Sequence, residues 1–284
     1  MILMDYLNNK TELVGIIGKP SDWLIASVPT DDVLNKLDGF KFINIPIQKL
    51  YSIYDKVITK ADGALLNSLP IINESINQDE RRKAEALFLA LKQLVDENNL
   101  TAFTIRCFDL LLEYQTTGCF ALSKLNDEGI IAGCEGDIAS LIGMIIAIRK
   151  TGQPTWMANP SQIDIENKQL ILAHCTVPAC MAENVKLDTH FESNQGIGLI
   201  GKIPESDVTL FRLGGKDLDK KFVVTGKIIP HEHSPNLCRT QICVKIDDSV
   251  KLNELLLCPL GNHLLVLFGK HTDILDEYIK NKRI

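Results

Sequence analysis

The sequence predicts an open α/β domain of the Rossmann-like kind, followed by a mainly antiparallel, β-barrel-like domain that contains a buried helix. Three observations indicate this architecture. Strand-like and helix-like patterns alternate as far as about residue 130, one helical segment is apolar on all sides, and short β-rich runs dominate from residue 155 onward. The length of 284 residues is about twice that of a typical domain of roughly 150 residues, so we assign residues 1–130 and 131–284 to two domains.

The first domain shows the alternation that is typical of a parallel sheet covered by helices. Residues 79–97 form the clearest amphipathic helix, because apolar residues recur at helical spacing and charged residues occupy the opposite face. Residues 101–108 are β-branched and aromatic, which is typical of a buried strand. The elements expected before them are a strand at 13–17, a second candidate strand at 24–28, a helix after Thr30, a strand at 41–45 and a helix at 47–60.

Asp109 directly follows the run at 101–108, which places it at the carboxyl end of the predicted strand. Open α/β sheets bind their ligands outside this edge, so the position favours a functional role. An aspartate after a strand is also a common turn or helix N-cap residue, and the position taken alone favours this structural role slightly.

The second domain begins with a helix that must be buried. Residues 138–148 are apolar on every side, acidic residues precede them, and Arg149 and Lys150 follow them, as the helix dipole favours. The start of this helix therefore brings Glu135 and Asp137 into the interior or into a cleft. Capping explains one buried carboxylate, whereas two raise the alternative of a metal or acid–base site, and both interpretations stay open.

Short β-rich runs separated by Pro, Gly, Asn and Asp follow this helix, and this pattern indicates an antiparallel sandwich or barrel. The runs span residues 155–158, 169–173, 198–200, 208–213, 222–229, 241–246 and 264–268. A final helix is expected over residues 272–280, so the β-rich domain extends almost to the end of the sequence.

Composition and charge exclude several classes of protein. The net charge is −6 and the longest basic block is 81–83, so the basic surface of a nucleic-acid-binding protein is absent. The N-terminus lacks the apolar core of a signal peptide, and residues 138–148 are too few to span a bilayer, which takes roughly 20. We expect a cytoplasmic protein with a small-molecule partner and with neither nucleic acid nor membrane. Its eight cysteines contain no Cys-x-x-Cys pair and are expected to be reduced and mostly buried.

Six polar residues are candidates for metal or acid–base chemistry, because a divalent cation takes oxygen and imidazole ligands. They are Asp109, Glu135, Asp137, His174, His190 and His263. His263 immediately precedes an apolar run and is presented at the start of a strand, although a lone histidine there is more often a hydrogen-bonded structural residue. Neither a dinucleotide-binding glycine pattern nor a Walker motif is present, which disfavours a nucleotide cofactor.

Several motifs, in the correct order, resemble the L-fucose isomerase family. Ala-Gly-Cys-Glu-Gly-Asp-Ile at 132–138, with the apolar helix behind it, resembles the start of the family's C-terminal domain, and Leu-Gly-Asn-His at 260–263 resembles a motif near its end. Further matching motifs are Gly-Gln-Pro at 152–154, Trp-Met-Ala-Asn at 156–159, Leu-Ile-Leu-Ala-His-Cys at 170–175 and Val-Thr-Leu-Phe-Arg-Leu at 208–213. Gly-Lys-Pro-Ser-Asp-Trp at 18–23 resembles the family's middle domain, so the resemblance spans most of the chain.

The resemblance implies a homo-oligomeric isomerase that converts an aldose to its ketose by proton transfer through an ene-diol. It also implies a divalent cation, usually manganese, that stabilises the charge developing on the sugar oxygens. The implied metal ligands are Asp109, Asp137 and His263, of which the two aspartates would also share the acid and base roles. The resemblance also implies that Asn262 contacts the sugar, and we expect His174 and Trp23 to contact it too. Glu135 and His190 are candidates for orienting the ligands or the sugar hydroxyl groups.

The chain departs from the family in two ways. A glutamate that binds the metal in the family is replaced by Asp109, whose carboxylate is one methylene shorter. Nothing in the sequence resembles the family's separate N-terminal domain, so we expect a more open pocket or one that a partner completes. These departures leave an alternative, a noncatalytic sugar- or metabolite-binding relative that retains the isomerase scaffold.

Overall fold

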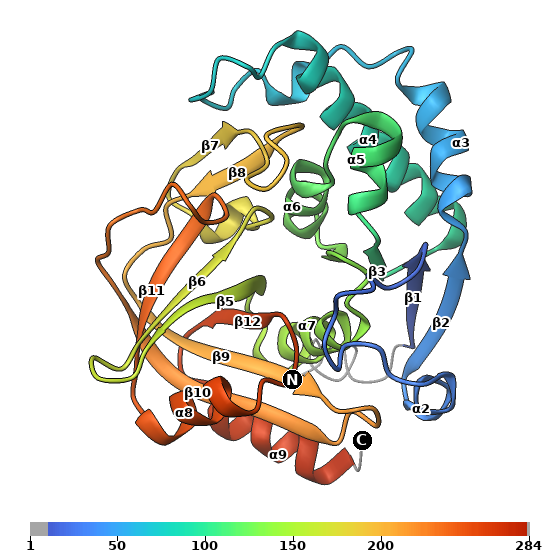
Figure 1. Ribbon diagram of the computed structural model, residues 1–284. Coiled ribbons are helices and arrows are strands. Elements are labelled where there is room, and N and C mark those ends of the chain that lie inside the picture. The colour runs from blue at the N-terminus through green and yellow to red at the C-terminus, as the bar shows by residue number, and fades with distance from the viewer. Residues whose placement is uncertain (1–10, 283–284) are drawn as a thin grey trace.

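The structure of the chain is a computed structural model that describes residues 11–282. A four-stranded parallel sheet with its helices forms the first part, and a closed six-stranded antiparallel barrel forms the second (Figure 1). Among the helices of the described residues, none combines the length and the apolar character that a membrane span requires.

The parallel sheet has the strand order β2-β1-β3-β4, so β1 pairs with both β2 and β3. Its strands are β1 (Glu12–Ile17), β2 (Phe40–Ile45), β3 (Ala102–Ile105) and β4 (Ile131–Gly133). The helices of this part are α2 (Asp31–Lys36), α3 (Ile47–Val57), α4 (Gln78–Asn98), α5 (Phe108–Tyr114) and α6 (Cys119–Asp127), with a short 3-10 helix at Ala64–Leu66. The predicted parallel α/β arrangement is confirmed, with a sheet of four strands, whereas the predicted Rossmann-like fold is confirmed only in part.

Helix α4 shows how local sequence fixes this part of the fold. The Asn77 side chain accepts hydrogen bonds from the backbone N–H groups of Asp79 and Glu80, which caps the first turn. The apolar stripe of the helix is buried, and α4 packs against α3 and α6. Asn99 ends the helix in a left-handed conformation with φ of 51°, so the predicted boundaries hold to within a residue or two.

The barrel closes in the order β10-β11-β6-β5-β12-β9, which confirms the predicted antiparallel, barrel-like arrangement. Its strands are β5 (Trp156–Asp164), β6 (Gln169–His174), β9 (Asp207–Gly214), β10 (Lys220–Ile229), β11 (Thr240–Ile246) and β12 (Leu264–Phe268). Elements outside the barrel are the paired strands β7 (Val185–Asp188) and β8 (Gly198–Gly201), a 3-10 helix at Ala179–Met181, and helices α8 (Ser249–Leu257) and α9 (Thr272–Lys282). The sequence pattern predicts α9 but neither β7 nor α8.

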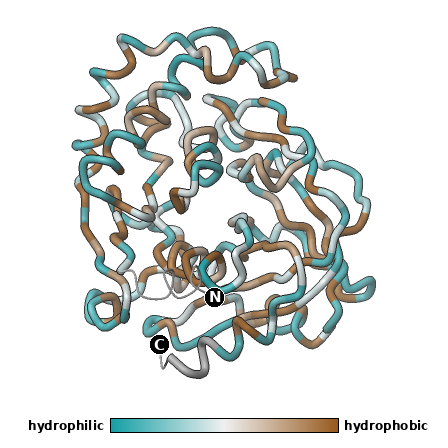
Figure 2. The backbone as a smooth tube through the Cα atoms, turned by 180° about the vertical axis from the view of Figure 1, so that it is seen from behind, coloured by the Kyte–Doolittle hydropathy of each residue, from teal (hydrophilic) through white to brown (hydrophobic). Residues whose placement is uncertain are grey.

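Helix α7 (Ile138–Thr151) packs against both parts of the molecule. It contacts β3 and β4 of the sheet and β9 and β12 of the barrel. Residues 138–147 are all buried, as the all-round apolar pattern predicts, and Figure 2 shows hydrophobic segments gathered in the interior. One hydrophobic core includes residues of both parts, so α7 is shared and the boundary at residue 130 stays a prediction.

The candidate strand at 24–28 is wrong, because these residues belong to an irregular loop that follows β1. The Ile25 N–H donates to the Oδ1 atom of Asn262 at 2.7 Å instead of bonding to a neighbouring strand. Ala26 has a left-handed φ of 47°, which a strand does not accommodate. The loop therefore reaches from the sheet to the start of β12.

The strand predicted over 101–108 is shorter than expected. It ends at Ile105, and α5 begins at Phe108, so Asp109 lies in the first turn of a helix. The Asp109 carboxylate pairs there with the guanidinium of Arg106 at 2.9 Å. The position of Asp109 is therefore set by a helix start and not by the end of an extended strand.

Candidate functional site

A cavity of about 520 Å³ is lined by residues from both parts of the molecule. The polar residues on its wall are Thr117, Glu135, Asn159, Ser161, His174, His190, Glu192 and Asn262. The large apolar residues on its wall are Trp23, Phe108, Leu111, Phe191 and Leu237. A cavity of this size, with apolar surface and a few converging polar groups, suits a small polar metabolite.

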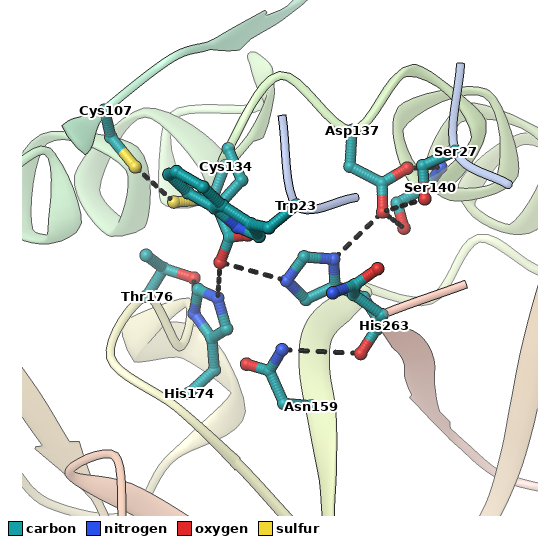
Figure 3. Close-up of polar contacts among 12 residues, drawn as sticks. Trp23, Ser27, Cys107, Cys134, Asp137, Ser140, Asn159, His174, Thr176 and His263 are labelled. Atoms are coloured by element: carbon teal, nitrogen blue, oxygen red, sulfur yellow. Dashed lines mark hydrogen bonds and ion pairs between the residues drawn. The ribbon is translucent and has the colours of Figure 1, made fainter. Parts of the chain in front are cut away.

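Three ionisable side chains lie together at the edge of this cavity: Glu135 and His174 line it, and His263 lies behind them. The Nε2 atom of His263 lies 3.3 Å from Oε1 of Glu135, and Nε2 of His174 lies 3.9 Å from the same oxygen. Figure 3 shows the two imidazole rings directed at this oxygen from different sides. All three side chains are buried, and His263 has no exposed surface.

Each of the three side chains lies at or next to the end of a β-strand. Glu135 follows β4 in a turn with a left-handed φ of 60°, His174 ends β6, and His263 immediately precedes β12. Gly136 continues the turn with φ of 71°, and a Cβ atom there would lie 2.7 Å from the Cα of Pro20. A glycine at this position therefore allows the loop after β1 to pack against the turn that carries Glu135.

Hydrogen bonds fix the orientation of both imidazole rings. The Nδ1 atom of His174 pairs with the hydroxyl of Thr176 at 2.8 Å, and Nδ1 of His263 donates to Oδ2 of Asp137 at 2.9 Å. In each ring the second nitrogen, Nε2, is thereby turned toward Glu135. Such a partner on one nitrogen is the usual device for fixing the tautomer of a metal-binding histidine.

Trp23 covers the Glu135 carboxylate from the loop after β1. Its indole N–H donates to Oε2 of Glu135 at 2.8 Å, and its ring meets Phe108 edge-on with 4.9 Å between the ring centroids. Trp23 lines the cavity, and it binds the Glu135 oxygen that the two histidines do not contact.

Asp137 and Arg212 form a fully buried ion pair behind the cavity. Oδ2 of Asp137 accepts from Nη1 of Arg212 at 2.8 Å, while Oδ1 accepts the Ser140 N–H at 2.8 Å and caps α7. Arg212, on β9, also donates to the Ser27 hydroxyl at 2.6 Å and to the backbone oxygen of His263 at 3.3 Å. Through these bonds, the ion pair connects α7, the barrel and the loop after β1 with His263.

Burial and neighbouring charges lower the pKa of His174 but raise that of His263, and they lower the pKa values of both carboxylates. Burial lowers the pKa of His174 to about 4. Burial disfavours the charged form of His263 too, but the bonds to Asp137 and Glu135 outweigh it and raise its pKa to about 9. For Glu135 the effect of burial is outweighed by the hydrogen bond and charge of His263, which lower its pKa to about 2. Against the same burial, the charge of Arg212 and the bond to His263 hold the pKa of Asp137 well below its usual range.

The group of Glu135, His174 and His263 fits a divalent cation. Two ligand atoms that each lie about 2.1 Å from one ion are separated by roughly 3 to 4 Å, and the observed separations are 3.3 and 3.9 Å. Imidazole nitrogens and a carboxylate oxygen are common ligands of first-row divalent metals. A cation in this group would take the place of the proton on Nε2 of His263.

The structure gathers part of the predicted site. Five of the predicted residues line the cavity, namely Trp23, Glu135, His174, His190 and Asn262. Of the ligands implied by the family resemblance, only His263 belongs to the group that fits a cation, while Asp137 bonds to the other nitrogen of His263. Glu135, expected in a supporting role, and His174, expected as a sugar contact, complete the group. Arg212 is absent from the predicted set, although an arginine inside the apolar run 208–213 is a sequence signal of a buried cation.

Asp109 is not brought to this cavity. Its neighbours Cys107 and Phe108 line the cavity, whereas Asp109 lines a second cavity of about 670 Å³ together with Arg106. The chain therefore passes close to the site, but the start of α5 turns the Asp109 carboxylate toward another part of the molecule.

The cysteines are all free thiols, as expected of reduced residues. Five of them line the cavity, namely Cys107, Cys119, Cys134, Cys175 and Cys238. The sulfur atoms of Cys107 and Cys134 lie 3.0 Å apart (Figure 3). Buried thiols behave as small, weakly polar groups, so they extend the apolar part of the wall.

Gly261→Ala is expected to destabilise the protein by about 1–3 kcal/mol, because a Cβ atom there would overlap the guanidinium of Arg212 and push it away from Asp137. Urea unfolding measures the loss. Gly118→Ala is the matched control, since its added Cβ would meet no atom closer than 3.5 Å. Equal stability of the two variants would contradict this packing.

Comparison with known proteins finds no matching family model, but it does find similar curated proteins. The chain is 28% identical over 206 residues to a sulfoquinovose isomerase of Clostridium sp. (strain MSTE9), covering 68% of this chain and 44% of that protein. It is 29% identical over 216 residues to a sulfoquinovose isomerase of Alkalicoccus urumqiensis, covering 71% and 47%. The chain thus spans about half the length of the curated relatives it matches.

These matches relate the chain to sugar isomerases as a class, in agreement with the motifs that resemble the L-fucose isomerase family. More particularly, the relatives are sulfoquinovose isomerases, and a third one, from Priestia aryabhattai, is 22% identical over 214 residues. At these identities the similarity supports the broad family and not one particular member.

Proposed function

We propose that the chain supplies the metal and sugar site of an aldose–ketose isomerase, with a divalent cation, manganese by preference, held by Glu135, His174 and His263. The observation that carries this proposal is the convergence of two imidazole nitrogens and one carboxylate oxygen beside a cavity of a size suited to a sugar, with Glu135 and His174 on the cavity wall. The similarity to sulfoquinovose isomerases supports the reaction class.

The reaction moves one proton between adjacent carbons of the open-chain sugar and another between their oxygens. A cation in this group supplies electrophilic stabilisation of the negative charge that develops on these oxygens. Asp137 holds the Nδ1 proton of His263 and so keeps Nε2 directed at the group. Asn159 and Asn262 line the cavity and offer amide groups to sugar hydroxyls, and Nδ2 of Asn159 donates to the backbone oxygen of Asn262 at 3.3 Å.

The sugar itself follows from similarity alone. Sulfoquinovose, a glucose derivative with a sulfonate at C6, is the first substrate to test, because the curated relatives are named for it. L-fucose is the second, because the sequence motifs resemble the L-fucose isomerase family.

His263→Ala is expected to weaken manganese binding by more than about 100-fold and to abolish isomerisation, because it removes a ligand and leaves the Asp137 carboxylate without its imidazole partner. Titration calorimetry measures manganese affinity, and ketose formation from sulfoquinovose, L-fucose and D-arabinose measures activity. His233→Ala is the matched control, because His233 is exposed and bonds only to the backbone oxygen of Arg239.

The outcomes distinguish the site from the reaction. Unchanged manganese affinity in His263→Ala would contradict the metal site. Stoichiometric manganese in the wild-type protein without turnover of any of the three sugars would contradict the isomerase and favour the noncatalytic sugar-binding alternative.

A further inference from the structure

Another histidine, His190, lines the same cavity from the loop that follows β7. His190 lines the cavity and is 8% exposed, and its Nδ1 atom pairs with the hydroxyl of Ser193 at 3.0 Å. Within residues 11–282 no hydrogen bond or ion pair involves its other ring nitrogen, Nε2. Because His190 lines the cavity, Nε2 is the ring atom that remains available to a molecule bound there.

Aromatic contacts connect His190 to the metal-binding group. Its ring meets Phe108 edge-on with 5.9 Å between the centroids, and Phe108 meets Trp23, which donates to the Glu135 carboxylate. His190 is also near enough to act electrostatically on His174, whose pKa is lowered by burial and by the charges of neighbouring histidines. A sugar held at Glu135 would therefore lie against the wall that carries His190.

The other acids and bases near the cavity are less suited to carrying a proton to and from a carbon atom. Glu135 belongs to the metal-binding group, and Asp137 is enclosed in a buried ion pair. Asp109 faces the second cavity. Glu192 lines the first cavity but is exposed, and no hydrogen bond orients it among the described residues, whereas Ser193 orients His190.

We propose that His190 is the catalytic residue that carries the carbon-bound proton, a role that rests on the proposed isomerase function. Nε2 accepts the proton from C2 of the open-chain aldose, the C2–H electron pair forms a C1=C2 double bond, and the carbonyl electron pair moves to O1. The proton of the C2 hydroxyl passes to O1. The imidazolium then returns its proton to C1 as the C2 carbonyl forms, so no oxidant or reductant is consumed.

His190→Gln tests this role, because glutamine keeps a polar side chain but cannot carry the proton. In D₂O the wild-type protein is expected to incorporate deuterium at C1 of the ketose formed from sulfoquinovose or L-fucose. The variant is expected to lose kcat and deuterium incorporation by about 10²–10⁴-fold with unchanged manganese affinity. His233→Gln, in an exposed loop, is the matched control and is expected to behave as the wild type.

A second measurement does not need turnover. The Hε1 proton resonance of His190, assigned by its loss in His190→Gln, is expected to shift when sulfoquinovose or L-fucose is added to the metal-free protein, whereas that of His233 is not. A missing shift would contradict contact between His190 and the sugar.

The kinetic outcomes separate this inference from the proposed function. If the wild-type protein turns over and His190→Gln retains its rate and deuterium incorporation, the inference is overturned and the isomerase proposal stands. If Glu192→Gln abolishes both and His190→Gln does not, Glu192 carries the proton instead. If the wild-type protein binds manganese but neither isomerises nor incorporates deuterium, both proposals fail.

Discussion

Arg212→Met is expected to destabilise the protein by about 3–5 kcal/mol, because it leaves the carboxylate of Asp137 buried without its cation. The two side chains are 1% and 0% exposed and their charged atoms lie 2.8 Å apart, so water cannot replace the guanidinium. Ser27 and Ser140 would keep their hydroxyls at Asp137, but a hydroxyl carries no compensating charge. Urea unfolding of the metal-free protein, followed by circular dichroism, measures the difference.

A double variant tests whether the loss of stability comes from the unpaired buried charge. Asp137→Asn combined with Arg212→Met leaves no uncompensated charge and is expected to be more stable than Arg212→Met alone. Lys202→Met removes one partner of a surface pair whose side chains are 74% and 49% exposed, and it is expected to change stability by less than about 1 kcal/mol. A similarly small loss for Arg212→Met would show that the buried pair does not stabilise the fold.

The periodicity of apolar residues predicts those helices whose apolar side chains are the ones that become buried. The all-round apolar pattern of 138–148 corresponds to α7, which lies between two packed parts, and the stripe in 79–97 corresponds to α4. Helix α8 was missed for a related reason. Its residues Val250 and Leu257 are 72% and 77% exposed, so apolar residues there do not mark a buried face.

The loop after β1 shows where local sequence fails. Residues 24–28 have the composition of a strand, but the backbone of Ile25 bonds to a side chain 237 positions further along the chain. Local composition contains no information about a partner at that separation. The same loop contributes Trp23 and Ser27 to the site, so the segment that was hardest to predict connects the two parts of the molecule there.

The residue types of the candidate site could be predicted, but their roles could not. Glu135 and Asp137 lie two positions apart at a helix start, and composition cannot tell which one faces the cavity. The left-handed conformations of Glu135 and Gly136 direct the first carboxylate to the histidines, while Asp137 caps α7 and meets Arg212. Both outcomes depend on contacts with the barrel that form only in the folded chain.

Asp137→Asn is expected to weaken manganese binding by about 10–100-fold without abolishing it. The carboxylate accepts the Nδ1 proton of His263 and thereby directs Nε2 to Glu135, and a neutral amide accepts that proton more weakly. Asparagine keeps the size of the side chain and can still cap α7. Calorimetric titration with manganese measures the affinity, with Asp164→Asn as the matched control, because Asp164 ends β5 away from the site and bonds to Asn167.

The size of the loss distinguishes two roles for Asp137. A loss as large as that of His263→Ala would make Asp137 a metal ligand, as the family resemblance implies. A loss of about 10–100-fold would make it the residue that orients His263, because the ligand atoms remain while one ring loses its fixed direction. Unchanged affinity would contradict both roles. Asp137 would then serve only to cap α7 and to pair with Arg212.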